Sequence, residues 1–379
     1  MPSIPNERWR LFNTNRPAST FTHLDTAAAG RSSVETLRAV AAHAEREAVA
    51  GAYVAAAEAA PLIAAGRAAL AGLFGVEPGG IAFTESGSAA LSALLQSWPV
   101  SAGQTVAVLP SEWGPNLDAF ADRGLRVDWL AAGQDGIIDL DALRRSVAMT
   151  PPAFVHLTLV ASHRPLVQPA AEVASVCHEA GVPLWVDAAQ ALGHVPVSCG
   201  ADAMYAVSRK WLTGPRGVGI VAVAEPWWRR LRPHASELDR IGLGDGSPVL
   251  LLESPEAHFA GRLGLCNAVS EFLSAGPAAV YERLAQVGKE TRAAMAEVPG
   301  WQLVGEADAP SAITALRPAA GQDVTAVRSM LLEQHQIVTT AALPARAPRE
   351  MTGPYLRISP HVNCAPADID RLAAALPPS

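Results

Sequence analysis

The sequence has few cysteines and no excess of positive charge. Its 379 residues include only four cysteines (Cys177, Cys199, Cys266 and Cys364), and no two of them form a CxxC pair. Zinc sites and disulfide scaffolds need closely spaced or paired cysteines, so this pattern argues against both and favours a reducing cytoplasm. The formal net charge is -7 at pH 7. A nucleic-acid-binding surface would need a basic face, so none is expected.

Long apolar runs are also missing from the sequence. No uninterrupted apolar run reaches the roughly 20 residues that a bilayer-spanning helix requires. The N-terminal stretch MPSIPNERWRLF carries charges and prolines where a signal peptide would need an apolar segment. We therefore expect a cytoplasmic protein whose partners include neither nucleic acid nor a membrane.

The length and the apolar content of the chain favour a globular protein with more than one domain. Half of the residues are hydrophobic and 17% are charged, which is enough for a large buried core. A chain of 379 residues exceeds the usual size of one hydrophobic core. We expect an N-terminal arm over residues 1–18, a large domain over 19–250 and a small domain over 251–379.

Short apolar strands alternate with helical segments between residues 81 and 207. The expected strands are 81–84, 105–109, 125–130, 154–160, 182–186 and 203–207, and the expected helices begin near Ser88 and cover 117–123, 139–147 and 169–180. This alternation is typical of an α/β fold with a mostly parallel sheet covered by helices on both faces. Before it, residues 34–59 are helical with a break near Gly51, and Pro61 is expected to begin another helix that ends at residue 74.

The pattern changes after residue 223. Residues 241–248 are rich in Gly and Pro and are expected to form a lid or connector. The segments beyond them predict a smaller α+β domain. Its expected helices are 257–274, 277–298, 324–334 and 366–376, and its expected strands are 301–304, 312–316, 337–340 and the LRIS segment.

Two of the predicted strands are followed by ionisable residues. Asp187 follows strand 182–186, and Ser208, Arg209 and Lys210 follow strand 203–207. In open α/β sheets, ligands bind beyond the carboxyl ends of the strands. A lysine and an acid at that place suit pyridoxal phosphate (PLP), which needs a Schiff-base lysine and an acidic partner for its ring nitrogen. The ordinary alternatives are a helix cap for Asp187 and a solvated side chain for Lys210.

The segment after strand 81–84 has the composition of a phosphate-binding turn. Its small residues Ser86, Gly87 and Ser88 lead directly into a helix. The first N–H groups of a helix and the positive end of its dipole favour a bound phosphate. Taken alone, however, S-G-S is more often a simple helix cap.

Several motifs of this chain occur in the same order in a known family. FTESGSAAL, SEWGPN, VDAAQALGH, ADAMYAVSRKWLTGPRGVG and LRISPHVN resemble segments of class V aminotransferase-like PLP enzymes. That group includes cysteine desulfurases, selenocysteine lyases and isopenicillin N epimerase-like proteins. The similarity covers nearly the whole chain, and within the group the sequence most resembles hercynylcysteine sulfoxide lyases of ergothioneine biosynthesis. It implies fold type I, the PLP-dependent transferase fold, and a homodimer.

The resemblance also implies roles for individual residues. Lys210 matches the Schiff-base lysine and Asp187 the partner of the ring nitrogen, while Gln190 matches the donor to the phenolic oxygen of the cofactor. Trp113 matches the aromatic residue that stacks on the ring. The remaining matches are Gly87, Ser88 and Ser208 at the phosphate, Arg357 as the clamp for the substrate carboxylate and Ser162 near the ring. Tyr53 and the Trp227-Trp228 pair are candidates for contact with a trimethylammonium group of the substrate, although core packing is the more ordinary role for the tryptophans.

The sequence departs from the family at two places. The Glu-x-Gly-Thr segment, whose threonine reaches the phosphate in the neighbouring subunit, is replaced by Glu253-Ser254-Pro255-Glu256. Cysteine desulfurases carry a nucleophilic cysteine on the loop before the LRIS strand, and here that loop, TTAALPARAPREMTGPY, contains none. Persulfide chemistry needs a thiolate at the substrate sulfur, so desulfuration is not expected.

The expected activity is that of a PLP-dependent carbon–sulfur lyase. It would cleave hercynylcysteine sulfoxide by β-elimination, with Lys210 as the general base, to give ergothioneine through a sulfenate, pyruvate and ammonia. The same residues would also serve an epimerase, an aminotransferase or a cysteine or selenocysteine lyase. A scaffold protein that retains the fold without activity is the alternative from another functional class.

Overall fold

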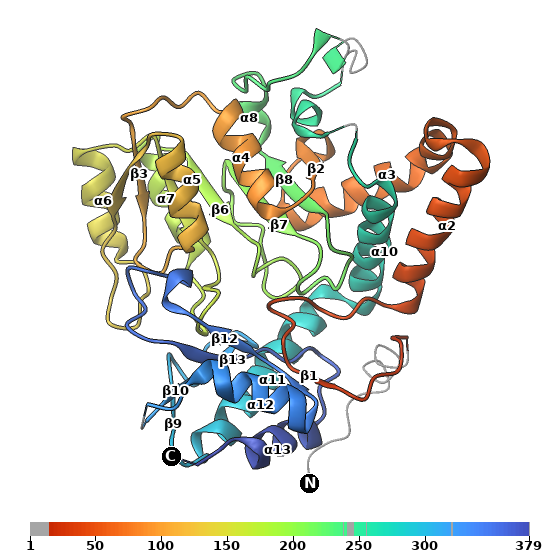
Figure 1. Ribbon diagram of the computed structural model, residues 1–379. Helices are drawn as coiled ribbons and strands as arrows, with labels where there is room; N and C mark the ends of the chain where they lie inside the picture. Colours follow the sequence, from red (N-terminus) through yellow and green to blue (C-terminus); the bar gives the residue numbers. More distant parts are fainter. Residues whose placement is uncertain (1–14, 238, 241–245, 255, 320, 379) are drawn as a thin grey trace.

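A seven-stranded sheet forms the centre of the larger part of the molecule (Figure 1). The computed structural model describes residues 15–237, 239–240, 246–254, 256–319 and 321–378. Most of the predicted N-terminal arm and residues 241–245 of the predicted connector therefore lie outside the described residues. In chain order the strands of this sheet are β2 (Ile81–Thr84), β3 (Thr105–Val108), β4 (Arg126–Trp129), β5 (Phe154–Thr158), β6 (Leu184–Asp187), β7 (Ala203–Val207) and β8 (Gly219–Val223).

The strand order in the sheet is β2-β8-β7-β6-β5-β3-β4. Strand β8 runs antiparallel to both of its neighbours, and the other pairs are parallel. The carboxyl ends of β2, β3, β5, β6 and β7 therefore meet at one edge of the sheet. The prediction of a mostly parallel sheet is confirmed, and β8 is a strand that the sequence analysis did not identify.

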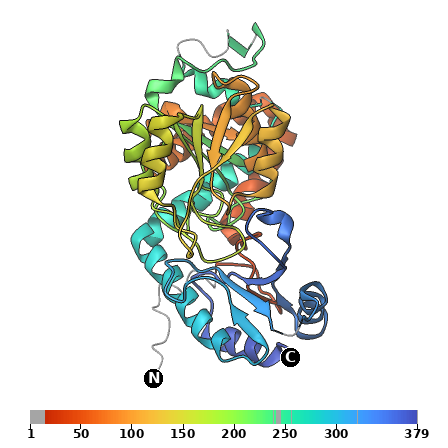
Figure 2. The same cartoon turned by 90° about the vertical axis from the view of Figure 1, so that its left-hand side faces the viewer.

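Helices cover both faces of the sheet, as expected (Figure 2). Helices α4 (Gly87–Ser97) and α5 (Gly114–Asp122) bury Ala90, Leu91, Leu94 and Phe120 against one face. Helices α6 (Leu140–Met149) and α7 (Ala170–Glu179) bury their apolar residues on the opposite face, together with the end of α3. The sheet is thus the middle of three layers.

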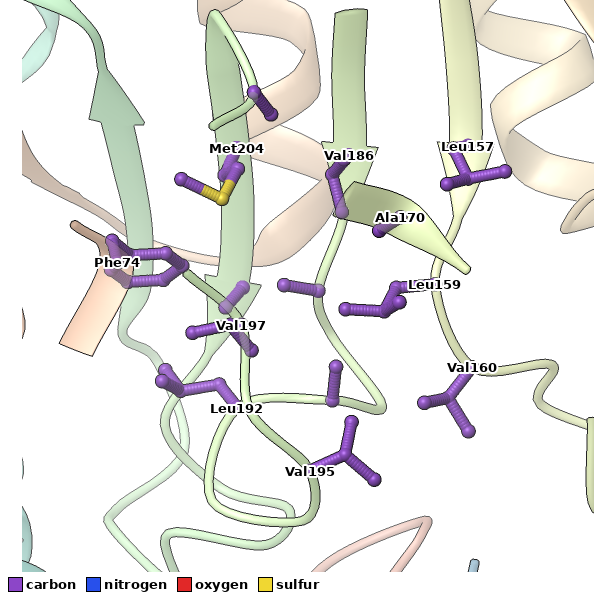
Figure 3. Close-up of a cluster of buried hydrophobic side chains, with 14 of the residues drawn as sticks. Phe74, Leu157, Leu159, Val160, Ala170, Val186, Leu192, Val195, Val197 and Met204 are labelled. Carbon is purple, nitrogen blue, oxygen red and sulfur yellow. The ribbon is translucent and has the colours of Figure 1, made fainter. Parts of the chain in front are cut away.

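The pleat of β5, β6 and β7 separates two kinds of side chain. Leu157, Val186 and Met204 are register partners in one row and belong to a single apolar cluster (Figure 3). Thr158, Asp187 and Tyr205 are the partners in the next row, one residue further along each strand. Because successive side chains of a strand point to opposite faces, this second row faces α4 and α5.

Three long helices pack together beside the sheet. They are α2 (Val34–Ala50), α3 (Ala52–Phe74) and α10 (Phe259–Ala275). Pro61 lies inside α3, so the expectation that it begins a new helix is wrong. An interior proline removes one helix hydrogen bond, and the continuous helix tolerates that loss. By length and composition α3 is also able to cross a membrane, which is weak evidence because core helices of soluble proteins pass the same test.

The smaller part of the chain is built on a four-stranded sheet with the order β12-β13-β10-β9. Its strands are β9 (Trp301–Leu303), β10 (Thr314–Pro318), β12 (Thr340–Ala342) and β13 (Tyr355–Ile358), and its helices are α11 (Pro277–Ala296), α12 (Val324–His335) and α13 (Pro366–Ala375). The domain boundary after residue 250 stays a prediction. Helix α10 lies beyond that boundary but packs against α2 and α3.

The segment over residues 22–30 connects the two parts. Its strand β1 (Thr22–His23) pairs in parallel with β11 (Ile337–Val338) of the smaller part. The Gly30 amide then donates to the Arg209 carbonyl at 2.7 Å. A Cβ atom at Gly30 would lie 2.4 Å from the carbonyl oxygen of Lys210, so only glycine fits there. We call residues 22–30 the N-terminal strap.

Candidate active site

A cavity of about 380 Å³ lies at the carboxyl ends of the sheet strands. Residues that follow β2, β3, β5, β6 and β7 form its wall, together with Arg346 from the short helix η3 (Pro344–Arg346) of the smaller part. Seven of the predicted site residues line it: Gly87, Ser88, Trp113, Ser162, Asp187, Gln190 and Lys210. These seven residues lie between positions 87 and 210 of the sequence, and the structure gathers them around one cavity.

Asp187 is the last residue of β6 and is almost completely buried. Its Oδ1 accepts from the Ala189 amide at 2.8 Å, and its Oδ2 accepts from Asn116 Nδ2 at 3.1 Å. Both bonds fix the direction of the side chain. The carboxylate is therefore a preformed partner for a cationic ring nitrogen.

Lys210 follows β7 and lines the same cavity. Burial, together with the nearby Arg209, Arg357 and Arg346, lowers the pKa of Lys210 from 10.5 to about 7 against the opposing effect of Asp187. A lysine with this pKa is partly neutral at physiological pH. Only the neutral amine is a nucleophile or a base, so the environment prepares Lys210 for both roles.

The N-terminus of α4 forms another part of the wall. Ser86 caps this helix by accepting from the Ala89 amide, and Gly87 and Ser88 are its first two residues. A Cβ atom at Gly87 would lie 2.9 Å from Val207 Cγ1, so glycine allows β7 to pack tightly against this turn. The exposed amides and the helix dipole make the turn suitable for a phosphate group.

Gln190 and Trp113 are fixed by their neighbours. Gln190 donates through Nε2 to the Ala27 carbonyl and accepts at Oε1 from the Trp211 indole, both at 2.9 Å. One hydrogen of the Gln190 amide remains for a ligand. Trp113 precedes α5, and the Arg346 guanidinium lies over its ring at 5.3 Å from the centroid.

Ser208 does not line the cavity, and its role as a phosphate ligand stays a prediction. The side chain is fully buried, and its hydroxyl donates to the Pro215 carbonyl. A hydroxyl has one hydrogen, so it cannot donate to a phosphate at the same time. Ser208 instead closes the loop between Lys210 and Gly217, where Gly214 also donates to the Ser208 carbonyl at 3.0 Å.

Arg357 also lies behind the cavity wall rather than in it. It is completely buried in β13 and donates to the Ser162 carbonyl at 2.8 Å and to Asp25 Oδ1 at 3.0 Å. The expected clamp for the substrate carboxylate is therefore already paired with a carboxylate of the N-terminal strap. Binding a substrate there would require breaking the Asp25 pair.

The structure does not bring Tyr53 to the cavity. It lies near the start of α3 with 89% of its surface exposed. Trp227 and Trp228 lie in the short helix α8 (Glu225–Trp228) and have the more ordinary packing role. Trp227 stacks on Trp98 with 4.3 Å between the ring centroids. The Trp228 indole donates to the Val223 carbonyl at the end of β8.

Residues 253–256, which replace the threonine-bearing segment of the family, have a structural role where they are described. Glu253 follows the short helix η2 (Pro248–Leu252) and forms ion pairs with Arg67 at 2.6 Å and Arg262 at 3.0 Å. Pro255 lies outside the described residues.

Two arginines of the cavity wall were not identified from the sequence. Arg209 and Arg346 both line the cavity, and neither forms an ion pair with a described acidic residue. Burial and the neighbouring Arg357 and Arg209 lower the pKa of Arg346 to about 10. The same wall carries the acidic residues Glu85 and Asp187, so the two arginines are the groups that can receive an anionic part of a ligand. The signal for Arg346 was its position on the loop where the family carries a cysteine.

A group of buried polar residues behind Asp187 was also missed. Asn116, Thr158 and Tyr205 line the cavity, while Glu112 and His156 are buried beneath them. The available signal was a pair of polar residues, His156 and Thr158, at alternate positions of an otherwise apolar strand. Such a pattern places both on the same face of the sheet.

None of the cysteines among the described residues lines this cavity. Burial raises the pKa of Cys177 to about 12 and that of Cys266 to about 11, and it also raises those of Cys199 and Cys364. These thiols are therefore poor nucleophiles at neutral pH. Within the described residues, no group of three or more His, Cys, Asp or Glu side chains is placed to hold a metal ion.

The sequence is similar to those of known enzymes over much or nearly all of its length. The chain is 46% identical over 374 residues to a probable hercynylcysteine sulfoxide lyase of Mycobacterium tuberculosis, covering 98% of this chain and 92% of that protein. It is 30% identical over 241 residues to a probable cysteine desulfurase of Chlamydia muridarum, which covers 59% of each chain.

Solved structures of low sequence identity share the fold. A cysteine desulfurase from Thermococcus onnurineus NA1 superimposes with a TM-score of 0.83 at 17% identity, covering 99% of this chain and 98% of that one. The cysteine desulfurase CsdA from Escherichia coli gives a TM-score of 0.83 at 19% identity over 98% of both chains. These structures confirm the expected fold type I architecture. The family model for aminotransferase class-V matches residues 22–372, and the chain belongs to that family.

Proposed function

We propose that this protein is a PLP-dependent carbon–sulfur lyase that cleaves hercynylcysteine sulfoxide. The observation that carries the proposal is the joint placement of Lys210 and Asp187 in one cavity, next to the N-terminus of α4. The 46% identity to a probable hercynylcysteine sulfoxide lyase over nearly the whole chain supports the choice of substrate.

The residues of the cavity fit PLP in size and in chemistry. Gly87 and Ser88 would hold the phosphate, Asp187 the ring nitrogen, Gln190 the phenolic oxygen and Trp113 one face of the ring. The Lys210 amine would bind the aldehyde. When bound there, PLP supplies an electron sink that acidifies the Cα hydrogen of an amino-acid substrate.

Lys210 then acts as the proton carrier of the site. Its amine, with a pKa of about 7, takes the Cα proton of the substrate. The electron pair of the Cβ–S bond leaves with the sulfur as a sulfenate. The three-carbon fragment that remains reacts with water to give pyruvate and ammonia. Two equivalents of an external thiol would reduce the sulfenate to ergothioneine and leave as a disulfide, with the oxygen released as water.

Arg346 is the residue that we assign to an anionic group of the substrate. It lies on the cavity wall without a described acidic partner, whereas Arg357 is paired with Asp25. A guanidinium recognises a carboxylate through two parallel hydrogen bonds. Hercynylcysteine sulfoxide carries two carboxylates, and a site with several arginines suits such a substrate.

The absence of a cysteine from the loop around Arg346 agrees with a sulfoxide substrate. A desulfurase needs a thiolate to take the sulfur atom. A sulfenate is a better leaving group than a thiolate, so its departure requires no attacking cysteine. The loop therefore supplies a positive charge to the substrate in place of a nucleophile.

The decisive experiment is an assay of the PLP-loaded protein with hercynylcysteine sulfoxide. We expect pyruvate and the sulfur product in equal amounts. Loaded protein that forms no pyruvate would contradict the lyase. Amino transfer to an added 2-oxo acid would instead indicate an aminotransferase, and loss of chirality at Cα without pyruvate would indicate an epimerase. Protein that remains colourless with PLP would favour a scaffold.

We also propose a cytoplasmic homodimer that uses the face formed by α2, α3 and α10. Val54 and Leu62 of α3 are 50% and 63% exposed, and an apolar groove of about 850 Å³ lies between the three helices. Light scattering after gel filtration tests this, with Leu62→Glu expected to give monomers. A monomeric wild-type protein at micromolar concentration would contradict it.

A further inference from the structure

Five buried side chains form a closed hydrogen-bonded ring behind the cavity. The ring runs from Glu112 to His156, Tyr205, Asp187, Asn116 and back to Glu112, and we call it the Asp187 ring. All five residues are less than 9% exposed. Only Asp187, Asn116 and Tyr205 reach the cavity wall, so Glu112 and His156 form a layer behind them.

Four of the five contacts in this ring have hydrogen-bonding geometry. Glu112 Oε2 lies 2.8 Å from His156 Nδ1, and His156 Nε2 lies 3.0 Å from the Tyr205 hydroxyl. The fifth contact joins the Tyr205 hydroxyl to its register partner Asp187, and burial together with the charge and hydrogen bonding of Asp187 raises the pKa of that hydroxyl. The Asn116 amide closes the ring by donating to Glu112 Oε1 at 2.8 Å and to Asp187 Oδ2 at 3.1 Å.

The positions of the hydrogens follow from the partners. An ionised Asp187 has no hydrogen to donate, so the single hydrogen of the Tyr205 hydroxyl points to Asp187. The Tyr205 oxygen must then accept from His156 Nε2–H. At the other end, Glu112 Oε1 accepts from Asn116, from Thr158 at 2.8 Å and from the Trp113 amide at 2.9 Å. Against the effect of burial, His156 and these side-chain hydrogen bonds lower the pKa of Glu112 below its ordinary value, so its carboxyl group is ionised. His156 therefore donates from Nδ1 as well.

A histidine that donates from both nitrogens is an imidazolium. We propose that Glu112, His156 and Tyr205 are positioning residues that hold Asp187 as a carboxylate directed at the ring nitrogen of PLP. The inference rests on the proposed binding of PLP in this cavity. It does not depend on which sulfur compound is cleaved.

The charges of the group agree with this arrangement. Burial alone would lower the pKa of His156, but the charge and hydrogen bond of Glu112 and the charge of Asp187 raise it above the ordinary value. Burial alone would raise the pKa of Glu112, and His156 together with Asn116 and Thr158 lowers it. Burial, Asp187 and Glu112 raise the pKa of Tyr205, which keeps its hydroxyl protonated as a donor.

A purely structural ion pair would stabilise the fold without affecting the cofactor. A structural role and a positioning role of the Glu112–His156 pair can be distinguished at Tyr205, which connects the pair to Asp187. Removing that hydroxyl leaves the pair intact but cuts the connection. Tyr205→Phe is therefore the most informative substitution, because it preserves the aromatic side chain that packs in the core.

The experiment measures the protonation of the cofactor directly. Wild-type protein, Tyr205→Phe and His156→Gln are loaded with PLP labelled with ¹⁵N in the ring, and the ¹⁵N chemical shift reports the protonated fraction of that nitrogen. His178→Gln is the control. His178 also lies near a carboxylate, 3.4 Å from Asp202, but it is on α7 and lines neither this cavity nor the groove between α2, α3 and α10.

We expect the protonated fraction of the ring nitrogen to fall in Tyr205→Phe and His156→Gln and to stay at the wild-type value in His178→Gln. In the lyase assay, kcat should fall by about tenfold or more in Tyr205→Phe and His156→Gln, while KM changes by less than about threefold. Folded, PLP-bound Tyr205→Phe with an unchanged ¹⁵N shift would overturn the inference. Wild-type protein that binds PLP without cleaving the sulfoxide would overturn only the proposed substrate.

Discussion

The two faces of strands β5, β6 and β7 differ in two adjacent rows of side chains, although the rows are only one residue apart along each strand. Leu157, Val186 and Met204 face one way and join a continuous apolar cluster. Thr158, Asp187 and Tyr205 face the other way, where two of them take part in a buried hydrogen-bonded ring and all three line the cavity. Successive side chains of a β-strand point to opposite faces of the sheet. The residues that stabilise the core therefore lie on one face, and those that line the cavity lie on the other. Substitutions on the two faces should therefore have different consequences.

The largest effect is expected on the polar side, at Lys210. Lys210→Ala should lower the rate of C–S cleavage by about 10³-fold or more, because it removes both the amine that binds PLP and the base. The far-ultraviolet circular dichroism should not change. Lys289→Ala is the control, since Lys289 is the only other lysine in the sequence and pairs with Asp308 on an exposed surface. A rate within tenfold of the wild type would contradict the assignment.

Asp187→Asn should produce the next largest effect. The side chain keeps its shape but loses the charge that favours a protonated ring nitrogen, so kcat should fall by about 10²-fold or more. The free energy of unfolding of the protein without PLP should change little. Steady-state kinetics and urea denaturation check the two halves of this prediction. Equal losses of activity and stability would show that the two faces are not separate in function.

On the apolar face, in the row next to Thr158, Asp187 and Tyr205, we expect a loss of stability without a loss of activity. Leu157→Ala should lower the free energy of unfolding by about 2–5 kcal/mol, because it removes buried methyl groups and leaves a cavity. The kcat of the protein that remains folded should be close to that of the wild type. Urea denaturation and active-site titration provide these values. A large fall in kcat per folded molecule would extend the catalytic role to this face.

A smaller effect concerns pH and Lys210. Its neutral amine is the form that attacks the PLP aldehyde, and its pKa of about 7 makes that form roughly a tenth of the total at pH 6 and nine tenths at pH 8. The rate of PLP capture by the protein without cofactor should therefore rise about tenfold between these values and then level off. Stopped-flow absorbance measures it. A rate that is still rising steeply at pH 10 would show an ordinary lysine.

The smallest effect is expected at Tyr53. Its ring is 89% exposed and lies outside the cavity, so Tyr53→Ser should leave KM and kcat within about twofold of the wild type. Arg346→Gln is the informative contrast and should raise KM by about tenfold or more. An increase of KM in Tyr53→Ser would restore the predicted substrate contact and place Tyr53 near a neighbouring subunit.

The fold was predictable because each strand of the main sheet is a short apolar run that ends at a turn. Strands 81–84 and 203–207 were predicted with the bounds that β2 and β7 have. Strand β8 was missed because it follows a Gly-Pro-Arg-Gly loop within five residues and no helix separates it from β7. Pro61 was misinterpreted because proline favours a first helical turn, and the packing of α3 against α10 overrides that preference.

The site was predictable to the extent that a residue is marked by its neighbours in the chain. Asp187 and Lys210 stand at the ends of apolar strands, and Lys210 is one of two lysines in the sequence. Ser208 and Arg357, which the resemblance assigns to the phosphate and to the substrate carboxylate, do not line the cavity. Their partners, the Pro215 carbonyl and Asp25, are set by tertiary contacts that a linear pattern does not contain. Arg346 and Glu112 are brought to the site in the same way.

The N-terminal strap has a consequence for the order in which the protein acquires its function. Thr22 pairs with Ile337, and Asp25 meets Ser359 and Arg357 in space. These contacts span more than 300 residues, and contacts of such long range are the slowest to form. The loop of Lys210 is covered by Gly30 only after the strap docks. A nascent chain therefore completes its large sheet well before it can complete the lysine site, and competence to hold PLP should be the last event of synthesis and refolding.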